Sequence, residues 1–465
     1  MTRDNSRRDF LKRTVFSTAA LAFSQRSSRA GPRGHKLEAG QGVVDTTPPI
    51  GIEMAGFHRP AGKERRIAGI RKPTAARALV LRCGGVQTVI ISLDICAVSR
   101  ELTARVQTRI ARQLGIPAAN IRLCATHTHS MPTFRYFRQW GVISPAYMAA
   151  VEDKIVLAAE RAQKDCAETE LHLGKSHAPG ASNNRTTKTW KTETQFAADS
   201  TDAQRWLDTY VHVLHFQRGN GKEPIVWYHF SAHPVCYQDD QAGPDWPGLV
   251  EELVRQKLNV APSFLQGHCG DVNAGDADHW IGPVERTAEP VAAAIIRAVE
   301  SARTVSLDAF RSRTDTVQLP LDMERFGDWL SRYRQDPAQC ASGAWVDPGF
   351  SKDWFQSATK WNAKRNRLSV PLSAVQLGDV ALAFHPSELY SCYGLRIQRD
   401  APAADTIVVG YTDDLIGYLP DPNAYTLGEY SAITVPKILD LPPFVPTAGR
   451  DLAGSAVTLL KNVFA

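Results

Sequence analysis

The order of apolar runs in the first third of the chain constrains the fold most strongly. Apolar runs at 77–82 and 88–93 flank a Gly-Gly pair, which predicts a β-hairpin because glycine supplies the positive φ of tight turns. A helix is predicted over 99–114, with Ser99 as its N-cap and Gly and Pro after its end. A strand-like run at 120–123 follows. This order of strand, helix and strand predicts an α/β fold with functional residues at strand ends.

The rest of the chain continues the pattern. Further hairpins are predicted around the glycine-containing turns at 219–221 and 378–379. Apolar spacing of three or four residues predicts further helices at 247–258, 284–303, 323–335, 389–399 and 449–463. A length of 465 residues allows two or three domains, but no repeat or low-complexity linker interrupts the chain. We therefore predict mixed β-sheets with flanking helices in one catalytic domain over 42–465.

Residues 1–30 have the pattern of a twin-arginine export signal, followed by a short linker over 31–41. Arg7-Arg8 precede an apolar run that is too short to span a bilayer, and a small-residue cleavage site stands at 28–30. A basic amphipathic helix is the alternative interpretation. The signal predicts delivery by the twin-arginine machinery to the periplasm or the cell exterior.

Removal of this signal changes the charge balance. It holds seven Lys and Arg against two Asp and Glu, which is five of the six net positive charges of the chain. The nearly neutral remainder gives no reason to expect nucleic acid or an anionic membrane as a partner. No second long apolar run occurs, so we expect no transmembrane segment and a soluble exported protein.

The eight cysteines are scattered and form no Cys-x-x-Cys pair. This spacing argues against a thiolate zinc site. One or two disulfides are possible in an oxidising compartment, but the sequence does not pair them. Several cysteines stand in apolar runs, where small core residues are the simpler interpretation.

Two histidines follow the apolar run at 120–123. His127 and His129 are separated by one residue, so in an extended strand their side chains would share one face and could meet the same ion. Neutral imidazole is the commonest zinc ligand. The alternative is a strand end with two solvated or hydrogen-bonded histidines.

Two further candidate ligands stand at predicted strand ends. His233 follows the predicted strand at 224–230, and Glu388 follows Pro386-Ser387. With the histidine pair they could form a His/His/carboxylate zinc site. Taken singly, a histidine before proline is more often structural, and a carboxylate in the first turn of a helix is favoured by the helix dipole.

At this point the order of motifs resembles the neutral, non-lysosomal ceramidase family, in its amino-terminal catalytic domain. The resemblance covers residues 42–465. It rests on Asp-Thr-Thr-Pro-Pro-Ile-Gly at 45–51, Ala-Gly-Phe at 55–57, Ala-Arg-Ala-Leu-Val at 76–80, Ser-Leu-Asp at 92–94, Ala-Thr-His-Thr-His-Ser at 125–130, Gly-Ala-Ser-Asn-Asn-Arg at 180–185, Ala-His-Pro at 232–234, Gly-Asp-Val at 270–272, Pro-Ser-Glu at 386–388 and the tyrosine-rich segment 410–430.

The resemblance implies a set of site residues. One zinc ion would be held by His127, His233, Glu388 and Tyr418. His129, Arg185 and Tyr430 match residues of the family's substrate site. Such a zinc site can keep an open position where bound water has a pKa of about 7, and the resulting hydroxide could attack an amide carbonyl. His129 would shuttle the proton, while Arg185 or Tyr430 would stabilise the oxyanion.

Three departures from the family pattern bear on the substrate. Asn273 replaces the family serine, which closes a serine acyl-enzyme route but leaves a hydrogen-bond donor for the substrate or oxyanion. The loop at 131–140 interleaves arginines and aromatics, so Arg135 and Trp140, with Tyr425, are candidate substrate-binding residues; an aromatic packing cluster is the alternative. We also expect no carboxy-terminal immunoglobulin-like domain.

The sequence therefore predicts an exported zinc amidohydrolase with its metal site at strand ends. Its substrate would be ceramide or a related N-acyl compound. The alternatives are a zinc hydrolase of a non-lipid substrate, such as a carbohydrate-linked amide or ester, and a zinc-stabilised binding protein without turnover.

Overall fold

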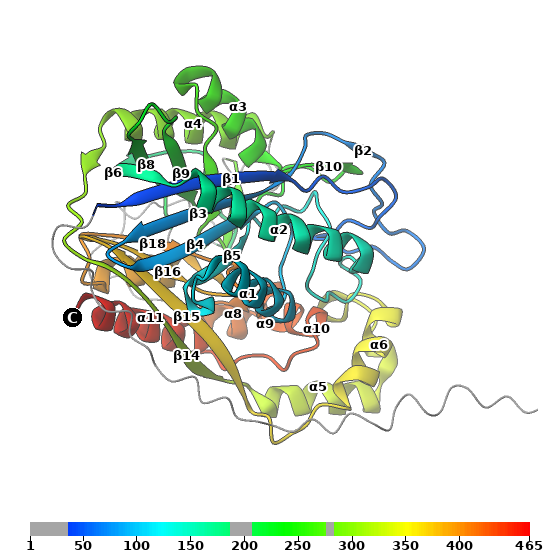
Figure 1. Ribbon diagram of the computed structural model, residues 1–465. Coiled ribbons are helices and arrows are strands. Elements are labelled where there is room, and N and C mark those ends of the chain that lie inside the picture. The colour runs from blue at the N-terminus through cyan, green and yellow to red at the C-terminus, as the bar shows by residue number, and fades with distance from the viewer. Residues whose placement is uncertain (1–35, 187–206, 276–282) are drawn as a thin grey trace, which may run out of the picture.

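Two β-sheets lie face to face in the centre of the protein, and helices cover their outer faces (Figure 1). This computed structural model describes residues 36–186, 207–275 and 283–465. The predicted mixed sheets with flanking helices are confirmed.

The larger sheet has the strand order β11-β9-β8-β6-β1-β3-β4-β5, and β13 pairs with β6. Its strands are β1 (Glu38–Asp45), β3 (Ala75–Cys83), β4 (Val86–Leu93), β5 (Ile121–Ala125), β6 (Ala167–His177), β8 (Tyr210–Arg218), β9 (Ile225–Phe230), β11 (Ser263–Gln266) and β13 (Arg303–Thr304). The pairs β4–β5 and β9–β11 are parallel, and the other pairs described in this sheet are antiparallel.

The smaller sheet has the order β14-β15-β16-β18. Its strands are β14 (Phe310–Pro320), β15 (Arg367–Leu377), β16 (Val380–Phe384) and β18 (Asp405–Val409). Short pairs join β2 (Gly69–Ile70) to β10 (Gln241–Ala242), β7 (Ser182–Asn184) to β12 (Val272–Ala274), and β17 (Glu388–Leu389) to β19 (Tyr418–Leu419).

Helices form the two outer layers. They are α1 (Arg100–Leu114), α2 (Pro145–Asp165), α3 (Trp246–Leu258), α4 (Glu285–Glu300), α5 (Met323–Gln335), α6 (Pro348–Ala358), α7 (Ser391–Asp400), α8 (Pro422–Leu427), α9 (Tyr430–Ile433), α10 (Val435–Ile438) and α11 (Ala448–Phe464). Helices α1 to α4 pack on the larger sheet, and α7 and α11 pack on the smaller one. Helices α5 and α6 lie beyond the end of β14 and β15 and share the apolar cluster of the smaller sheet. Apolar side chains of both sheets, such as Trp227 and Phe384, fill the space between them.

Most predicted elements are confirmed near their predicted bounds. In α1 the Ser99 hydroxyl accepts a hydrogen bond from the Leu102 amide at 3.3 Å, and Gly115 ends the helix with a φ of 69°. The prediction missed α2, α6, the short helices α8 to α10, and the long strands β6 and β14. It also placed Glu388 in the first turn of a helix, whereas Glu388 lies in β17 and α7 begins at Ser391.

The structure of residues 38–41 differs from the predicted linker. These residues form the first half of β1. Two glycines of β1, Gly40 and Gly42, are required by close packing against α2. A Cβ on Gly40 would lie 2.1 Å from the Ala162 carbonyl oxygen, and one on Gly42 would lie 2.0 Å from that of Ala158. Since real Cβ contacts are longer, only glycine lets the helix lie directly on this strand.

The larger sheet curls so that its edge strands approach each other. Strand β11 pairs with β9 and also contacts β5, the strand at the opposite edge. The loops that follow β5 and β9 therefore emerge side by side, with the end of β11 between them. This arrangement brings residues that are about 100 positions apart to one place.

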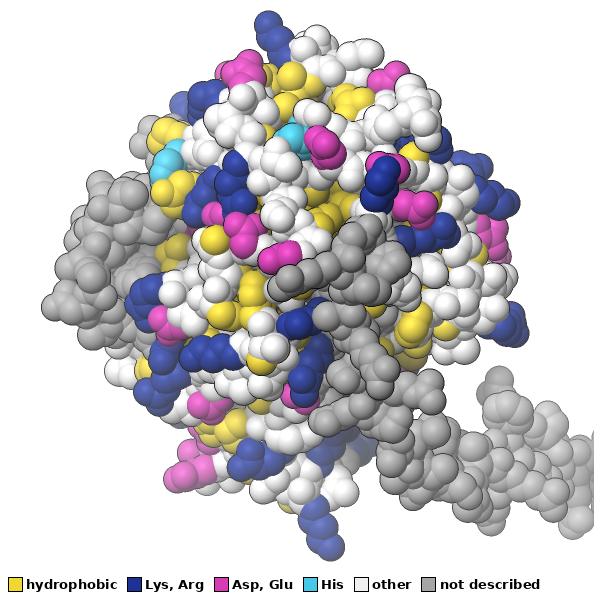
Figure 2. Space-filling model, turned by 60° about the vertical axis from the view of Figure 1, so that its left-hand side comes forward, with side chains coloured by type: hydrophobic (Ala, Val, Ile, Leu, Met, Phe, Trp, Pro, Cys, Tyr) yellow, Lys and Arg dark blue, Asp and Glu magenta, His cyan; other side chains and the backbone are white. Residues whose placement is uncertain are grey.

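Several predictions concern parts of the chain beyond the site. The export signal at 1–30 lies outside the described residues. In the described part, no helix is both long and apolar enough to cross a bilayer. No disulfide joins any two of the eight cysteines, and six of them are buried as expected for core residues. Basic and acidic side chains are both scattered over the face shown in Figure 2.

Candidate metal centre and substrate cleft

His127 is fixed in an unusual backbone conformation just beyond β5. Its φ is 62°, a value that non-glycine residues rarely adopt and that marks functional sites. Its amide donates to the Ile95 carbonyl at 3.0 Å, and its Nδ1 donates to the Cys96 carbonyl at 2.8 Å. The Tyr411 ring stacks on the imidazole with 4.3 Å between centroids. The ring is therefore held with Nε2 directed away from Cys96.

His233 and Glu388 complete a buried group around this nitrogen. His233 Nδ1 donates to the Val272 carbonyl at 2.8 Å. One oxygen of Glu388, Oε2, lies 3.4 Å from His127 Nε2 and 3.3 Å from His233 Nε2. All three residues are at most 5% exposed.

The donor set of this group fits a divalent cation. Both Nδ1 atoms are occupied by carbonyl oxygens, so each Nε2 keeps its lone pair, as in metal-bound histidine. The three ligand atoms lie within 4.8 Å of one another. Burial favours the neutral carboxyl of Glu388, but the two imidazoles outweigh this effect and hold its pKa well below the ordinary value. Two nitrogens and one carboxylate oxygen leave coordination positions open for substrate and water.

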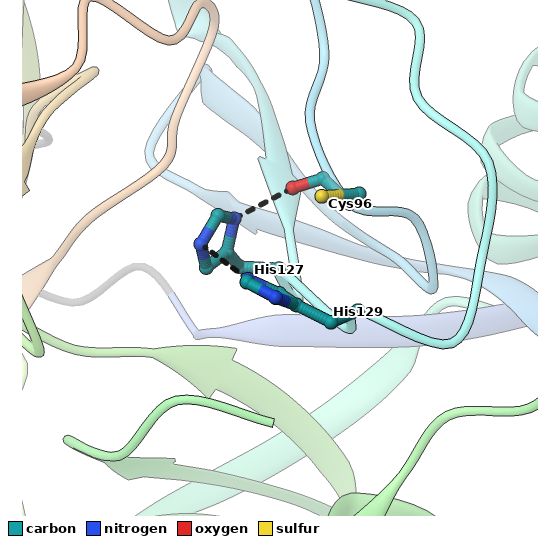
Figure 3. Close-up of side chains that lie close together, drawn as sticks. All are labelled: Cys96, His127 and His129. Carbon is teal, nitrogen blue, oxygen red and sulfur yellow. Dashed lines mark hydrogen bonds between the residues drawn. The ribbon is translucent and has the colours of Figure 1, made fainter. Parts of the chain in front are cut away.

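His129 contacts this group from the loop after β5. Its Nε2 lies 3.2 Å from that of His127 (Figure 3). The prediction attributed their proximity to alternation along a strand, which is wrong because β5 ends at Ala125. Burial and the neighbouring imidazoles hold the pKa of His129 well below its ordinary value, so it is neutral. Gly56, with a φ of 97°, makes room for it, since a Cβ there would lie 2.4 Å from the ring.

Cys96 is a site residue that the sequence analysis missed. It is buried beside the two histidines (Figure 3), and it forms with them a second group whose ligand-capable atoms lie within 4.8 Å. Its position shortly after the strand-like run at 88–93 was the only available signal, because a cysteine in an apolar stretch is typical of a core.

Tyr418 and Arg185 lie near Glu388. Tyr418 is the register partner of Glu388 in the β17–β19 pair. Arg185 Nη2 donates to the Tyr418 hydroxyl at 2.7 Å and to the Gly270 carbonyl at 2.8 Å, and Nη1 donates to Asn273 Oδ1 at 3.2 Å. Burial opposes the charge of Arg185, but the nearby Tyr418, Tyr390 and Glu388 raise its pKa above the ordinary value. A fixed positive charge therefore lies beside the candidate ligands.

A cleft of about 700 Å³ opens beside this group. Six predicted site residues line it: His129, Trp140, Arg185, Asn273, Tyr418 and Tyr430. An apolar recess of about 40 Å³ adjoins the cleft, next to His127, His129 and Glu388. The walls of the recess include Phe137, Trp140, Val435, Ile438 and Leu439.

Two predicted substrate-binding residues are placed elsewhere. Arg135 Nε donates to the Leu415 carbonyl at 3.1 Å and lies 3.6 Å from Asp414. Tyr425 is buried, with the Arg325 guanidinium 5.3 Å from its ring centre. Neither is among the described residues that line the cleft or the recess. Both side chains interact with nearby residues of the protein instead of facing the cleft, which the sequence could not show.

Comparisons with known proteins show the family of the chain. A family model described as neutral/alkaline non-lysosomal ceramidase, N-terminal, matches residues 37–276. The neutral ceramidase of Mycobacterium tuberculosis is 24% identical over 480 residues, covering 85% of this chain and 73% of that protein. The neutral ceramidase of Pseudomonas aeruginosa is 25% identical over 274 residues, covering 56% of this chain and 40% of that protein.

Solved structures share the fold. The crystal structure of neutral ceramidase from Pseudomonas aeruginosa has a TM-score of 0.68 at 19% identity, covering 92% of this chain and 75% of that chain. A ceramidase complexed with C2 has a TM-score of 0.69 at 18% identity, with the same coverage. With the family match over more than half of its length, the chain belongs to the neutral/alkaline non-lysosomal ceramidase family.

Proposed function

We propose that this protein is a zinc-dependent hydrolase that cleaves the amide bond of ceramide or a related N-acyl compound. The observation that carries the proposal is the convergence of His127, His233 and Glu388 beside a cleft that is lined by the half-buried Arg185. The names of both curated relatives support the substrate class. The predicted signal at 1–30 extends the proposal to an exported enzyme.

The residues at the candidate metal centre have different proposed roles in the reaction. His127, His233 and Glu388 would hold the zinc ion, with Tyr418 as the proposed fourth ligand. Zinc bound there would polarise the scissile carbonyl and lower the pKa of water to about 7. Neutral His129 would accept the proton of the attacking water and pass it to the leaving amine nitrogen.

Charge that develops on the carbonyl oxygen would be stabilised by Arg185, with the Tyr430 hydroxyl as a second donor. Fixed donors in a site that excludes water are effective because they need no reorganisation during the reaction. Asn273 accepts a hydrogen bond from Arg185 and so orients the guanidinium. Because asparagine is not an acyl acceptor, the proposed route transfers the acyl group directly to water.

The proposal is tested by turnover with and without metal. The purified protein should contain zinc and hydrolyse a fluorescent N-acyl sphingosine, lose activity on dialysis against a chelator, and regain it when zinc is restored. A panel of N-acyl sugars and acyl esters is run in parallel. Turnover of these compounds alone would favour the non-lipid hydrolase, and zinc without turnover on any compound would favour a binding protein.

The size of the recess predicts a preference for short acyl groups. The recess, at about 40 Å³, is far smaller than the cleft of about 700 Å³, so it accommodates a much smaller group than the cleft does. Its apolar walls suit an acyl chain, whereas the larger cleft offers polar groups such as Arg185 and Glu429 to the amine component. We expect kcat/KM for acetyl and butyryl amides to exceed that for the palmitoyl amide by about tenfold or more.

Shortening one wall residue should reverse this preference in part. Leu439→Ala lengthens the recess and should raise kcat/KM for longer acyl chains relative to short ones. Leu441→Ala removes the same volume nearby, but Leu441 is not among the recess residues, so the ratio should stay at the wild-type value. An equal shift in both variants, or faster palmitoyl hydrolysis by the wild type, would contradict the acyl assignment and leave the hydrolase proposal intact.

A further inference from the structure

The side chain of Gln266 connects the loops that carry the two histidine ligands. Gln266 is the last residue of β11 and is fully buried. Its Nε2 donates to the Thr126 carbonyl at 3.2 Å and to the Ala232 carbonyl at 3.0 Å. Thr126 directly precedes His127, and Ala232 directly precedes His233. One amide group therefore bridges the two peptide units that lead into the two imidazoles.

The remaining polar atoms of Gln266 are also used. Oε1 accepts from the Gly267 amide at 2.9 Å, which fixes the orientation of the side-chain amide. The Gln266 backbone carbonyl accepts from the Gly410 amide at 3.0 Å, next to Tyr411, whose ring stacks on His127. Gln266 is therefore the common hydrogen-bond partner of three segments, which contain Thr126, Ala232 and Gly410 and lead to His127, His233 and Tyr411.

The topology of the sheet explains why Gln266 reaches both loops. Strand β11 lies between β9 and β5, which are the strands that deliver His233 and His127. Strand β5 contacts β11 but forms no ladder with it among the described pairs. A backbone hydrogen bond from the His129 amide to the Pro234 carbonyl, at 3.0 Å, joins the two loops after the ligands, whereas Gln266 joins them before the ligands. The backbone of His127 has a positive φ, which is unfavourable for a non-glycine residue. Hydrogen bonds to the neighbouring residues help to stabilise this conformation.

We propose that Gln266 is a positioning residue that sets the distance between the two imidazole ligands and thereby the metal affinity of the site. This inference rests on the proposed metal centre, but not on amide hydrolysis. Its side chain touches neither metal ligand and acts only through the carbonyls of Thr126 and Ala232. Groups outside the ligand set that orient ligands typically change metal affinity by about 10- to 100-fold.

The test compares Gln266→Met with Gln376→Met in the full-length protein. Methionine keeps the length of the side chain and removes the amide. Gln376 is the matched control, because it is a buried glutamine whose Nε2 donates to a single carbonyl, that of Gly378, at 3.0 Å, away from the metal group. Zinc affinity is measured by chelator competition, and the cobalt-loaded proteins are compared by their visible absorption spectra, which report ligand geometry.

We expect Gln266→Met to bind zinc at least about tenfold more weakly and to show an altered cobalt spectrum, while Gln376→Met keeps the wild-type values. If Gln266→Met does not fold, Gln266→Asn, which retains the amide but withdraws it by one methylene group, is measured with the same expectation. Wild-type affinity and spectrum in the Gln266 variant, or equal losses in both variants, would overturn the inference. Absence of zinc binding by the wild type would overturn the metal centre and this inference together.

Discussion

His233→Ala is expected to yield a folded protein that neither retains zinc on purification nor hydrolyses any N-acyl substrate above background. His233 supplies one of the three buried ligand atoms, and its Nε2 lies 3.3 Å from Glu388. Even partners outside a ligand set contribute about 10- to 100-fold to metal affinity, so loss of a ligand should exceed that range. Metal content by elemental analysis and turnover of the fluorescent amide measure the two effects separately.

His212→Ala is the matched control for this substitution. His212 is buried on the neighbouring strand β8 and lies outside the metal group. Its replacement removes the same side chain from the same core, so it lowers the unfolding temperature without removing zinc. If His233→Ala retained stoichiometric zinc and full turnover, His233 would not be a ligand and the proposed centre would be wrong.

The hairpins and capped helices could be predicted because their signals are local. The N-cap at Ser99 and the glycine at 115 act within one turn of the chain, and the structure reproduces them. The first half of β1, by contrast, could not be predicted from local signals. Gly40 has no local signal for a strand, because the reason for its small size is helix α2, which lies more than 100 residues later.

The candidate site shows the same division between local and distant causes. His127, His233, Glu388 and Tyr418 could be nominated as a set from the resemblance, and the structure places them together. The cause of their proximity is the curl of the larger sheet, which no local pattern encodes. Gln266 shows this most clearly, since it becomes significant only when β11 is seen between β5 and β9.

Loss of the Arg185 guanidinium should lower kcat by about 10²- to 10³-fold, the range found when one oxyanion donor is removed. Arg185 is held by the Tyr418 hydroxyl, the Gly270 carbonyl and Asn273, so its position is fixed before substrate binds. In Arg185→Met we expect the zinc content to stay near one ion per chain, because the three ligands of the buried group are intact. Steady-state kinetics and metal analysis on the same preparation measure both quantities.

Two further substitutions separate charge from geometry. Arg185→Lys keeps a positive charge but loses the planar fork that reaches three acceptors at once, so its kcat should lie between those of the wild type and Arg185→Met. Arg135→Met should keep the wild-type kcat, since Arg135 binds the Leu415 carbonyl outside the cleft. A kcat for Arg185→Met within about threefold of the wild type would exclude oxyanion stabilisation by Arg185. In that case Tyr430, the other donor assigned to the carbonyl oxygen, would have to carry this role alone.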